Sequence, residues 1–548
     1  MPDEWSESRS LSDTLIVAPP GCGKTELLAQ RAANCIRMGL LPPGRRILAL
    51  TFLNRSRANV ASRLLEHLGG SRSESITVLN FHGLAAHLYG CHPYILDDPL
   101  REKPPDTRKL DRILRSAFKE YDVPPSEHEN VRRAIRIAKS GAYSDDEVTA
   151  RLQQSNSAAA MSYEAALRSD GLMDHDDVLR MGLRVIQHPL VAELYSERFA
   201  YLLVDEVQDL TRVQYQLIEP IGTGCTAFAG DRAQGIYAFA GADPTWVYAQ
   251  IEKRTPQRIE LKKSYRSSPE VLQAVSSIAK ELGGSELESA EPSKWRGRGK
   301  VEVMRFRDPE QEADWLCEQI GEWQSEADYD DQSAGLSVGI LSRMKAGPRR
   351  QAFLRRANAS NLQVEIWDYP LHQPMIINLL KRHVGPVVRT VAEEAEQYNE
   401  LYLRCFEDLA ESDVQTQIEL RDAIDELLEQ RDDGSLQTRI QRIRSTSAPD
   451  IPVGPGVHLL TGHAGKGQGY DRVVILGFEE GQIPSFFVKG LPDSDPAVRE
   501  ELALLHVMMS RARETLLFTI CQVVNGYSQK PSRWLGFVKE HAELIDRS

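Results

Sequence analysis

The chain has few cysteines and no long apolar run. Its seven cysteines are scattered, and no two have the CxxC spacing of zinc ribbons or iron–sulfur proteins. No stretch approaches the roughly 18 apolar residues of a transmembrane helix, and the polar, acidic start MPDEWSESRS is unlike a signal peptide. A low cysteine density suits a reducing compartment. These absences predict a soluble, cytoplasmic protein with no membrane partner.

Positive charge is also in deficit. The 548 residues include 66 Lys and Arg against 79 Asp and Glu, a net charge of −13. The excess is local, because residues 391–433 hold 15 acidic residues and three arginines, a net charge of −12. The rest of the chain is nearly neutral, so local basic surfaces for nucleic acid are not excluded. The ordinary composition, 41% hydrophobic and 26% charged, excludes collagenous and wholly disordered chains.

Short apolar runs alternate with helical patterns along the chain. Buried strands that alternate with amphipathic helices predict parallel α/β sheets. The alternation gives way to helical patterns at about residues 92–190 and 371–450. The sequence therefore predicts two α/β cores, each with a helical insertion. The runs typical of buried strands are Leu15–Ala18, Ile47–Phe52, Tyr201–Val204, Ala227–Ala229 and Val473–Gly477.

A glycine-rich loop follows the first predicted strand. Residues 18–25 read APPGCGKT, and a helical pattern begins there. Glycines allow backbone N–H groups to fold around phosphates, and the helix N-terminus adds its dipole. In such a P-loop, Lys24 reaches the β- and γ-phosphates and Thr25 ligates Mg²⁺. The strict GxxxxGK[ST] pattern fails only at Ala18, and the alternative is a chance glycine-rich helix start.

Acidic and amide side chains follow two further predicted strands. In LVDEVQD, Asp205 can hold Mg²⁺ and Glu206 can deprotonate the attacking water. In GDRAQGIYAFAGA, Gln234 stands where an amide can sense the γ-phosphate. Tyr237 and Phe239 alternate onto one side, where they can either stack on bases or pack in a core.

The second half of the chain contains three more short motifs. They are YRS at residues 265–267, TGHAGKG at 461–467 and LHVMMSRA at 505–512. Isolated arginines are usually solvated or ion-paired. Because the first core already supplies a phosphate site, Arg266 and Arg511 are candidates to complete that site across a cleft as arginine fingers.

Together these motifs resemble the UvrD/Rep/PcrA family of superfamily-one DNA helicases, in the family's order and over essentially the whole chain. TFLN at residues 51–54 and NFHG at 80–83 resemble two further family motifs that contact single-stranded DNA. The resemblance implies two RecA-like motor domains with ATP between them, DNA lying across both, and 3′ to 5′ polarity. The expected divisions are a first motor domain at 1–91 and 191–265, its helical insertion at 92–190, a second motor domain at 266–370 and 456–548, and a small acidic helical insertion at 371–455.

The resemblance also implies which residues form the sites. The residues that would carry out the phosphate chemistry are Lys24, Asp205, Glu206, Gln234, Arg266 and Arg511. Thr25 and Asp205 would bind Mg²⁺. Tyr265 would stack on adenine. The full ATP-binding set is Ala18, Pro19, Pro20, Gly21, Cys22, Gly23, Lys24, Thr25, Glu26, Tyr265, Arg266 and Arg511. The DNA-binding set is Thr51, Phe52, Asn54, Phe81, His82, Tyr237, Phe239 and His463.

Base and sugar recognition departs from the family pattern. None of the 17 residues before Ala18 is the glutamine that reads adenine in relatives. Gly469 stands where relatives carry a ribose-contacting glutamate. Ala240 replaces the arginine of the third motif, and Ser264 replaces the asparagine before YRS. The phosphate chemistry is therefore complete, whereas base and sugar recognition is reduced.

The sequence thus predicts an ATP- and Mg²⁺-dependent 3′–5′ DNA helicase or translocase. Its expected partners are single-stranded or tailed duplex DNA and a protein such as a nuclease, in repair, recombination or antiviral defence. The helicase subunit of a Gabija-like defence system is one candidate. The alternative is an ATP-gated DNA-binding regulatory subunit that does not unwind processively. An AAA+ protein machine shares PPGCGKT, but DEVQD and GDRAQGIYAFAGA argue against it.

Two further features leave alternatives open. The basic clusters at 294–307 and 343–356 are either ordinary surface faces or a phosphate track. Asp174, Asp176 and Asp177 resemble the family's DFDDLL segment, and their simpler role is helix capping.

Overall fold

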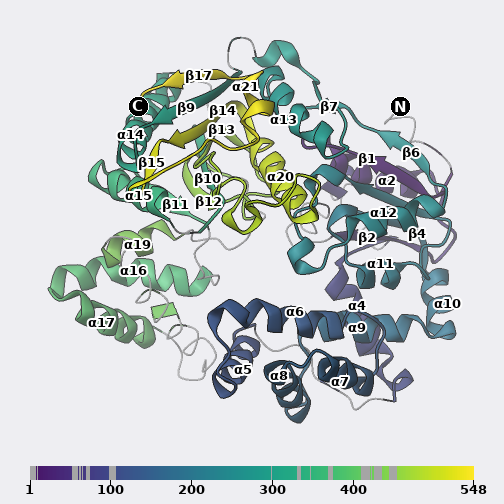
Figure 1. Cartoon of the computed structure of the whole chain (residues 1–548). Helices are drawn as coiled ribbons and strands as arrows, with labels where there is room; N and C mark the ends of the chain where they lie inside the picture. Colours follow the sequence, from purple (N-terminus) through teal and green to yellow (C-terminus); the bar gives the residue numbers. More distant parts are fainter. Residues whose placement is uncertain are drawn as a thin grey trace. The chain divides into compact units, whose positions relative to one another are not determined.

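The computed structural model divides the protein into two compact units (Figure 1). The first contains residues 1–19 and 23–261, and the second contains residues 20–22 and 262–548. The residues that the structure describes are 6, 8, 10–51, 60, 63–64, 66–68, 75–97, 101, 107–295, 297, 299–329, 335–345, 347–367, 374–408, 420, 423–424, 427, 435–443 and 453–548.

The first unit is built on a six-stranded sheet in the order β3-β2-β4-β5-β1-β6. Every pairing in it is parallel, as expected for strands joined through helices. The four runs predicted as strands in this part of the chain correspond to β1, β2, β4 and β5, except that Ala18 follows β1 and Phe52 lies outside the described residues. The strands are β1 (Thr14–Val17), β2 (Arg46–Thr51), β3 (Ile76–Asn80), β4 (Phe199–Val204), β5 (Thr226–Gly230) and β6 (Gln257–Glu260).

The main core of this unit joins the sheet to several helices. Apolar side chains of β1, β2 and β4 pack with those of α4, α9, α11 and α12. α9 lies unusually close to α4, because a Cβ added at Gly182 would lie 2.6 Å from the Cα of Ala85. The helices are α2 (Lys24–Arg37), α4 (Phe81–Cys91), α9 (His175–Ile186), α10 (Pro189–Arg198), α11 (Arg212–Ile218) and α12 (Pro244–Lys253), with short 3₁₀ turns η2 (Pro93–Ile95), η4 (Val207–Asp209), η5 (Arg232–Gln234) and η6 (Ala238–Ala240).

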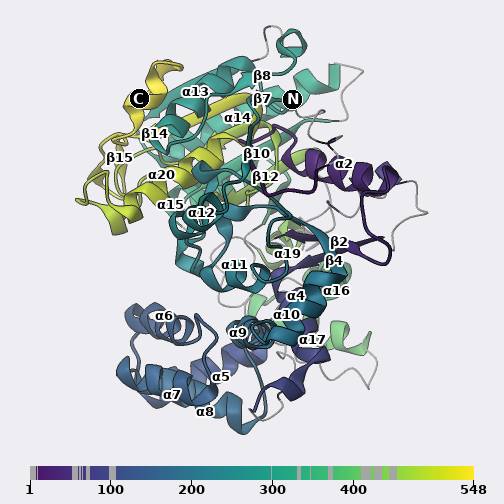
Figure 2. The same ribbon diagram turned by 90° about the vertical axis from the view of Figure 1, so that its right-hand side faces the viewer.

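Four helices between β3 and β4 form a separate bundle, here called the insertion bundle. They are α5 (Thr107–Glu120), α6 (His128–Ala138), α7 (Asp145–Gln154) and α8 (Ala158–Ser169), with η3 (Pro125–Glu127) before α6. Leu114, Ile135, Leu152 and Leu167 contribute to its own small apolar core. Figure 2 shows the four helices gathered together near α9.

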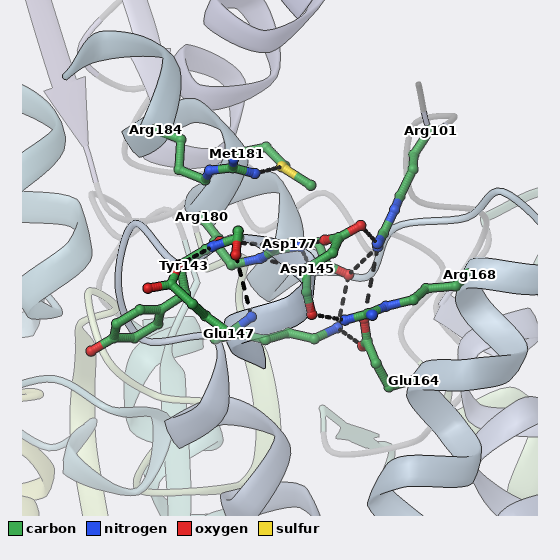
Figure 3. Close-up of polar contacts among 12 residues, drawn as sticks. Arg101, Tyr143, Asp145, Glu147, Glu164, Arg168, Asp177, Arg180, Met181 and Arg184 are labelled. Carbon is green, nitrogen blue, oxygen red and sulfur yellow. Dashed lines mark hydrogen bonds and ion pairs between the residues drawn. The ribbon is translucent and has the colours of Figure 1, made fainter. Parts of the chain in front are cut away.

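A buried ionic cluster joins the insertion bundle to α9 (Figure 3). Asp177 of α9 accepts a hydrogen bond from Nη2 of Arg180 at 2.8 Å and lies 3.7 Å from Nη1 of Arg101. Arg180 also donates to Asp145 of α7 at 2.8 Å, and Arg101 pairs with the same carboxylate. Cations and anions therefore compensate one another where water is excluded, which buried charges require.

Lys139 directly follows α6 and completes this cluster. Its ammonium lies 2.7 Å from Glu164, 2.7 Å from Asp174 and 2.8 Å from Asp177. Burial alone would lower the pKa of Lys139, but the three carboxylates outweigh burial and raise it. Asp174 and Asp177 also form a capping box at the start of α9, and Asp176 lies in its first turn. The capping role predicted for this segment is confirmed for Asp174 and Asp177.

Replacing Lys139 by Met should destabilise the first unit strongly. Glu164, Asp174 and Asp177 would lose their shared cation, and breaking a buried ion pair costs ~3–5 kcal/mol. Burial raises the pKa of Asp174 to about 7 in the folded protein, above the ordinary value for aspartate. Protonation of Asp174 therefore stabilises the folded state relative to the unfolded one, and this stabilisation is lost as the pH rises towards 7. A neutral carboxyl needs no cation. The loss in free energy of unfolding caused by Lys139→Met should therefore become smaller as the pH is lowered from about 8 to 5.

Urea denaturation at the two pH values measures this deficit. Lys119→Met, at an exposed position of α5, is the matched control and should unfold like the wild type. A Lys139→Met variant as stable as this control would show that the buried ammonium is dispensable.

The second unit holds a seven-stranded sheet in the order β11-β12-β10-β13-β14-β9-β17. Its pairings are all parallel. This second parallel sheet confirms the predicted α/β class with two cores. The strands are β9 (Lys300–Phe306), β10 (Ser337–Ser342), β11 (Val364–Ile366), β12 (Gly456–Thr461), β13 (Tyr470–Ile475), β14 (Ala512–Cys521) and β17 (Glu543–Asp546), with two small sheets, β7 (Lys263–Ser264) with β8 (Glu288–Ser289) and β15 (Val523–Val524) with β16 (Tyr527–Ser528).

The described helices of the segment predicted as the second insertion, residues 371–455, share an apolar core with this sheet. Ile376 of α16, Leu401 of α17 and Leu436 of α19 share one apolar core with Val338 and Leu459 of the strands. None of the described helices of the protein is long and apolar enough to cross a membrane. The helices of this unit are α13 (Pro269–Glu281), α14 (Pro309–Tyr329), α15 (Pro348–Ala359), α16 (Pro374–Thr390), α17 (Glu394–Glu407), α19 (Leu436–Arg442), α20 (Pro496–Met509) and α21 (Leu535–Lys539), with η7 (Pro292–Trp295) and η9 (Phe486–Val488).

Candidate functional site

The glycine-rich loop connects β1 to α2. The amide of Ala18 donates to the carbonyl of Gly230 at 3.0 Å, so the loop starts beside the carboxyl end of β5. Gly21 and Gly23 have φ angles of +76° and +79°, which L side chains rarely adopt. Gly23 is the N-cap of α2, and Lys24 is the first helical residue. A loop of this kind at a helix N-terminus is suited to bind an anion.

Lys24 faces the two acidic residues that follow β4. Its Nζ lies 3.2 Å from Oδ1 of Asp205 and 2.7 Å from Oε1 of Glu206. Thr25 Oγ1 donates to Oδ2 of Asp205 at 3.1 Å. Burial would lower the pKa of Lys24, but the two carboxylates raise it, whereas burial raises the pKa of Asp205. The structure thus brings four of the predicted site residues together within the first unit.

A chain of hydrogen bonds links Glu206 to Gln234. Gln208 donates from Nε2 to Glu206, and its Oε1 accepts from the amide of Asp231 at 3.0 Å. Asp231 then accepts from Nε2 of Gln234 at 2.9 Å. Glu206 itself has a left-handed backbone with φ 56° and ψ 45°, which is uncommon for a residue other than glycine. Sequence reasoning gave no role to Gln208 or Asp231, although both stand in the DEVQD and GDRAQ motifs.

Glu26, a predicted nucleotide-binding residue, is engaged by a neighbouring histidine and arginine. Its Oε1 lies 2.6 Å from Nε2 of His67, and its other oxygen pairs with Arg63. Burial would raise the pKa of Glu26, but these two hydrogen bonds lower it. Its carboxylate is therefore ionised and serves to tie α2 to the segment that carries Arg63 and His67.

In the second unit, Arg266 and Arg511 lie on either side of Ser510. Nη1 of Arg266 donates to the Ser510 carbonyl at 3.3 Å, and Nη2 of Arg511 donates to its hydroxyl at 2.8 Å. Arg511 is only 1% exposed and also donates to the carbonyl of Val507 at 2.9 Å. A Cβ added at Gly469 would lie 3.7 Å from Nε of Arg266. The two predicted arginines are thus neighbours, with Gly469 beside one of them.

Tyr265 combines a fixed backbone with an exposed ring. Its amide donates to the carbonyl of Gly21 at 2.9 Å, and Ser264 Oγ donates to the carbonyl of Pro20 at 3.1 Å. Residues 20–22 and Tyr265 belong to the same unit. Tyr265 as a whole is 61% exposed, as a stacking residue needs to be.

The predicted DNA-binding residues differ in exposure. Phe239 is 56% exposed, and its ring centroid lies 5.9 Å from that of Tyr237. His463, in the loop after β12, is partly exposed. Phe81, predicted to line the DNA track, starts α4 and is fully buried in the core against the sheet. The side chain of Thr51 is also buried.

The remaining members of this set are less accessible or not described. The ring of His82 is partly buried, 6.0 Å from that of His175. Burial lowers the pKa of His82 to about 4, with a smaller contribution from His175, so the ring is neutral at pH 7. Phe52 and Asn54 lie outside the described residues.

Most described members of the two basic clusters are paired with carboxylates, while Arg296 and Arg298 lie outside the described residues. Arg349 contacts Glu312 and Glu479, and Arg343 lies 2.6 Å from Glu501. Further ion pairs join Arg355 to Glu310, Arg356 to Asp314, Lys300 to Glu302, Arg305 to Asp546, Arg307 to Asp308 and Lys294 to Glu291. This pairing favours ordinary surface faces over a phosphate track.

Comparison with known proteins finds one family in both halves of the chain. Residues 3–255 match the family model described as UvrD/REP helicase N-terminal domain, and residues 376–523 match UvrD-like helicase C-terminal domain. The chain is 26% identical to ATP-dependent DNA helicase UvrD2 of Mycobacterium tuberculosis, over 95% of the chain and 78% of that relative. DNA helicase II of Escherichia coli is 24% identical over 96% of the chain and 86% of its own length. ATP-dependent DNA helicase PcrA of Staphylococcus epidermidis is 23% identical over 97% of the chain and 85% of its own length.

Proposed function

Because the chain belongs to the UvrD/Rep/PcrA family of DNA helicases, we propose that it hydrolyses ATP to move 3′ to 5′ along single-stranded DNA and to unwind tailed duplexes. The observation that carries the proposal is the buried contact of Lys24 with Asp205 and Glu206. A cation for phosphate, an oxygen ligand for Mg²⁺ and a carboxylate base are thereby held together at the end of one strand.

The residues of the first unit divide the phosphate chemistry among themselves. The loop amides and the ammonium of Lys24 bind the phosphates, and the raised pKa of Lys24 keeps it charged. Glu206 accepts the proton of the attacking water, and the bond from Gln208 fixes the orientation of its carboxylate. Gln234, at the far end of the same hydrogen-bond chain, is the residue proposed to respond to the γ-phosphate.

Thr25 and Asp205 fit the binding of Mg²⁺. Their oxygens already lie 3.1 Å apart, and Mg²⁺ typically takes one or two protein oxygens together with phosphates and water. Among the described residues, no group of three or more His, Cys, Asp and Glu side chains could hold a metal ion by itself. Mg²⁺ held by Thr25 and Asp205 would neutralise charge that develops on the phosphates.

Tyr237, Phe239 and His463 are the proposed base-stacking residues. Stacking on aromatic rings tolerates any base, which suits a motor that moves along DNA. Tyr237 follows Gln234 by three residues, so the segment that joins the phosphate network also carries the aromatic pair. We propose that nucleotide state reaches the DNA through this segment.

The acidic segment is proposed to serve a protein partner. Its net charge of −12 over residues 391–433 opposes binding to DNA phosphates and suits a partner with a basic face, such as a nuclease in repair, recombination or antiviral defence. Cross-linking mass spectrometry in cells should then place protein cross-links on this segment. Cross-links confined to other surfaces would exclude this role.

Two assays with purified protein test the proposed activity. ATP turnover should rise with single-stranded DNA, and duplexes with a 3′ tail should be unwound, whereas those with a 5′ tail should not. DNA-stimulated turnover without strand separation would identify a translocase. Turnover that ignores DNA would instead support the ATP-gated regulatory subunit.

The protein should discriminate only weakly between ATP and other nucleotides. Gly469 carries no carboxylate beside Arg266 to read ribose, and a site without groups that require partners discriminates poorly between analogues. We expect GTP and dATP to support hydrolysis within about tenfold of ATP (~1.4 kcal/mol). Steady-state kcat/KM for the three nucleotides measures this. A preference for ATP above about a hundredfold would show that another segment reads adenine.

A further inference from the structure

The turn that carries Tyr237 and Phe239 is tightly hydrogen-bonded. Residues 237–242 are here called the aromatic loop. The amides of Ala240 and Ala242 donate to the Tyr237 carbonyl at 2.9 and 3.1 Å. The loop is attached to the rest of the unit by a bridge between Thr211 and Ala242. Its exposed Phe239 ring therefore stands on a short, well-defined turn.

Arg136 of α6 reaches the outer side of this turn from the insertion bundle. Its Nη1 donates to the carbonyl of Phe239. Its Cδ packs against the next part of the loop, since a Cβ added at Gly241 would lie 3.4 Å away. Nη2 of Arg136 donates to Oε1 of Glu129 at 3.3 Å, which orients the guanidinium from two turns earlier in α6. A hydrogen bond from a charged donor is stronger than a neutral one.

The end of α6 that carries Arg136 is itself firmly held. Ile135 and Ala138 are buried in the core of the insertion bundle. Lys139, three residues after Arg136, is enclosed by the carboxylates of α8 and of the α9 capping box. Arg136 therefore extends from a fixed point, and the distance from the bundle to the aromatic loop is set by buried contacts.

We propose that Arg136 is a positioning residue that holds the aromatic loop in place for single-stranded nucleic acid. The inference rests on the proposed stacking role of Phe239. Arg136 acts on the loop backbone, 103 residues away in sequence, so it orders the loop without reading a base. The insertion bundle, which contains none of the residues of the phosphate site, thereby determines how well the protein grips DNA.

Arg136→Ala should loosen the loop and weaken the response to DNA. In hydrogen–deuterium exchange, the amides of residues 240–242 should exchange faster than in the wild type. The concentration of oligo(dT) that half-saturates ATPase stimulation should rise about tenfold, whereas turnover at saturating oligo(dT) should change less than twofold. Arg136→Lys keeps one donor and should recover part of the loss. Arg133→Ala, at an exposed position of the same helix, is the matched control.

A double-mutant cycle with Phe239→Ala separates this inference from the proposed function. If Arg136 acts through the aromatic ring, the two substitutions together should weaken DNA stimulation hardly more than Phe239→Ala alone. The inference fails, and the proposed function stands, if residues 240–242 exchange in Arg136→Ala as they do in the wild type. The same conclusion follows if Phe239→Ala raises the half-saturating oligo(dT) concentration but Arg136→Ala does not. If Phe239→Ala leaves half-saturation unchanged, the stacking role and the inference both fail.

Discussion

Glu206→Gln is expected to bind ATP and to lose hydrolysis by ~10²–10⁴-fold, the range for removal of a general base. The amide has the same shape and can still accept the hydrogen bond from Gln208, but it cannot accept a proton from water. Lys24 would keep its contact with Asp205, so the phosphate site should stay assembled. Phosphate release measures turnover, and fluorescence of a labelled nucleotide measures binding.

Glu219→Gln provides the matched control for this substitution. Glu219 is exposed in the same unit, and its substitution should leave turnover unchanged. Near wild-type turnover in Glu206→Gln would show that another group takes the proton. Loss of nucleotide binding would instead show that Glu206 mainly holds Lys24 in place.

Replacement of Arg266 or Arg511 by alanine is expected to lower turnover by roughly 10³-fold, the scale for a lost arginine that stabilises phosphate charge. The two guanidiniums meet at Ser510, so each variant should also weaken the contribution of the other, and the losses should not add. Affinity for single-stranded DNA in the absence of nucleotide should be little changed.

Arg511 needs a second variant because its side chain is buried. Arg511→Lys keeps the charge but loses the planar fork of donors, so it should fold and still turn over slowly. Thermal unfolding of each variant identifies any loss of fold. Losses in DNA affinity equal to the losses in turnover would place these arginines on the nucleic acid.

Much of the fold could be predicted from the sequence because the informative features are local. Apolar runs followed by polar motifs predicted β1, β2, β4 and β5 of the first sheet and β13 of the second. Asp174, with Asp177 three residues later, gave the helix cap of α9. The contact of Lys24 with Asp205 could also be expected, since parallel strands deliver their following residues to one edge of a sheet.

The features that could not be predicted depend on contacts distant in sequence. Phe81 stands in a motif shared with DNA-binding relatives, but its face of α4 is set by packing against the sheet. Arg343 looked available for phosphate until folding brought Glu501 to it, 158 residues later. The hydrogen bond from Arg136 to the Phe239 carbonyl also could not be predicted from motif spacing, because neither residue type indicates which partner it will contact.

The amide of Gln208 gives the link between Glu206 and Asp231 a direction. Its NH₂ group faces a carboxylate and its carbonyl faces a backbone N–H, so a half-turn of the amide would set acceptor against acceptor and donor against donor. Gln208 is fully buried, and no water can relieve that mismatch. The link therefore tolerates one orientation of one side chain. We expect a glutamate, an isoleucine or a rotated amide at position 208 to break the hydrogen-bonded path between Glu206 and Asp231.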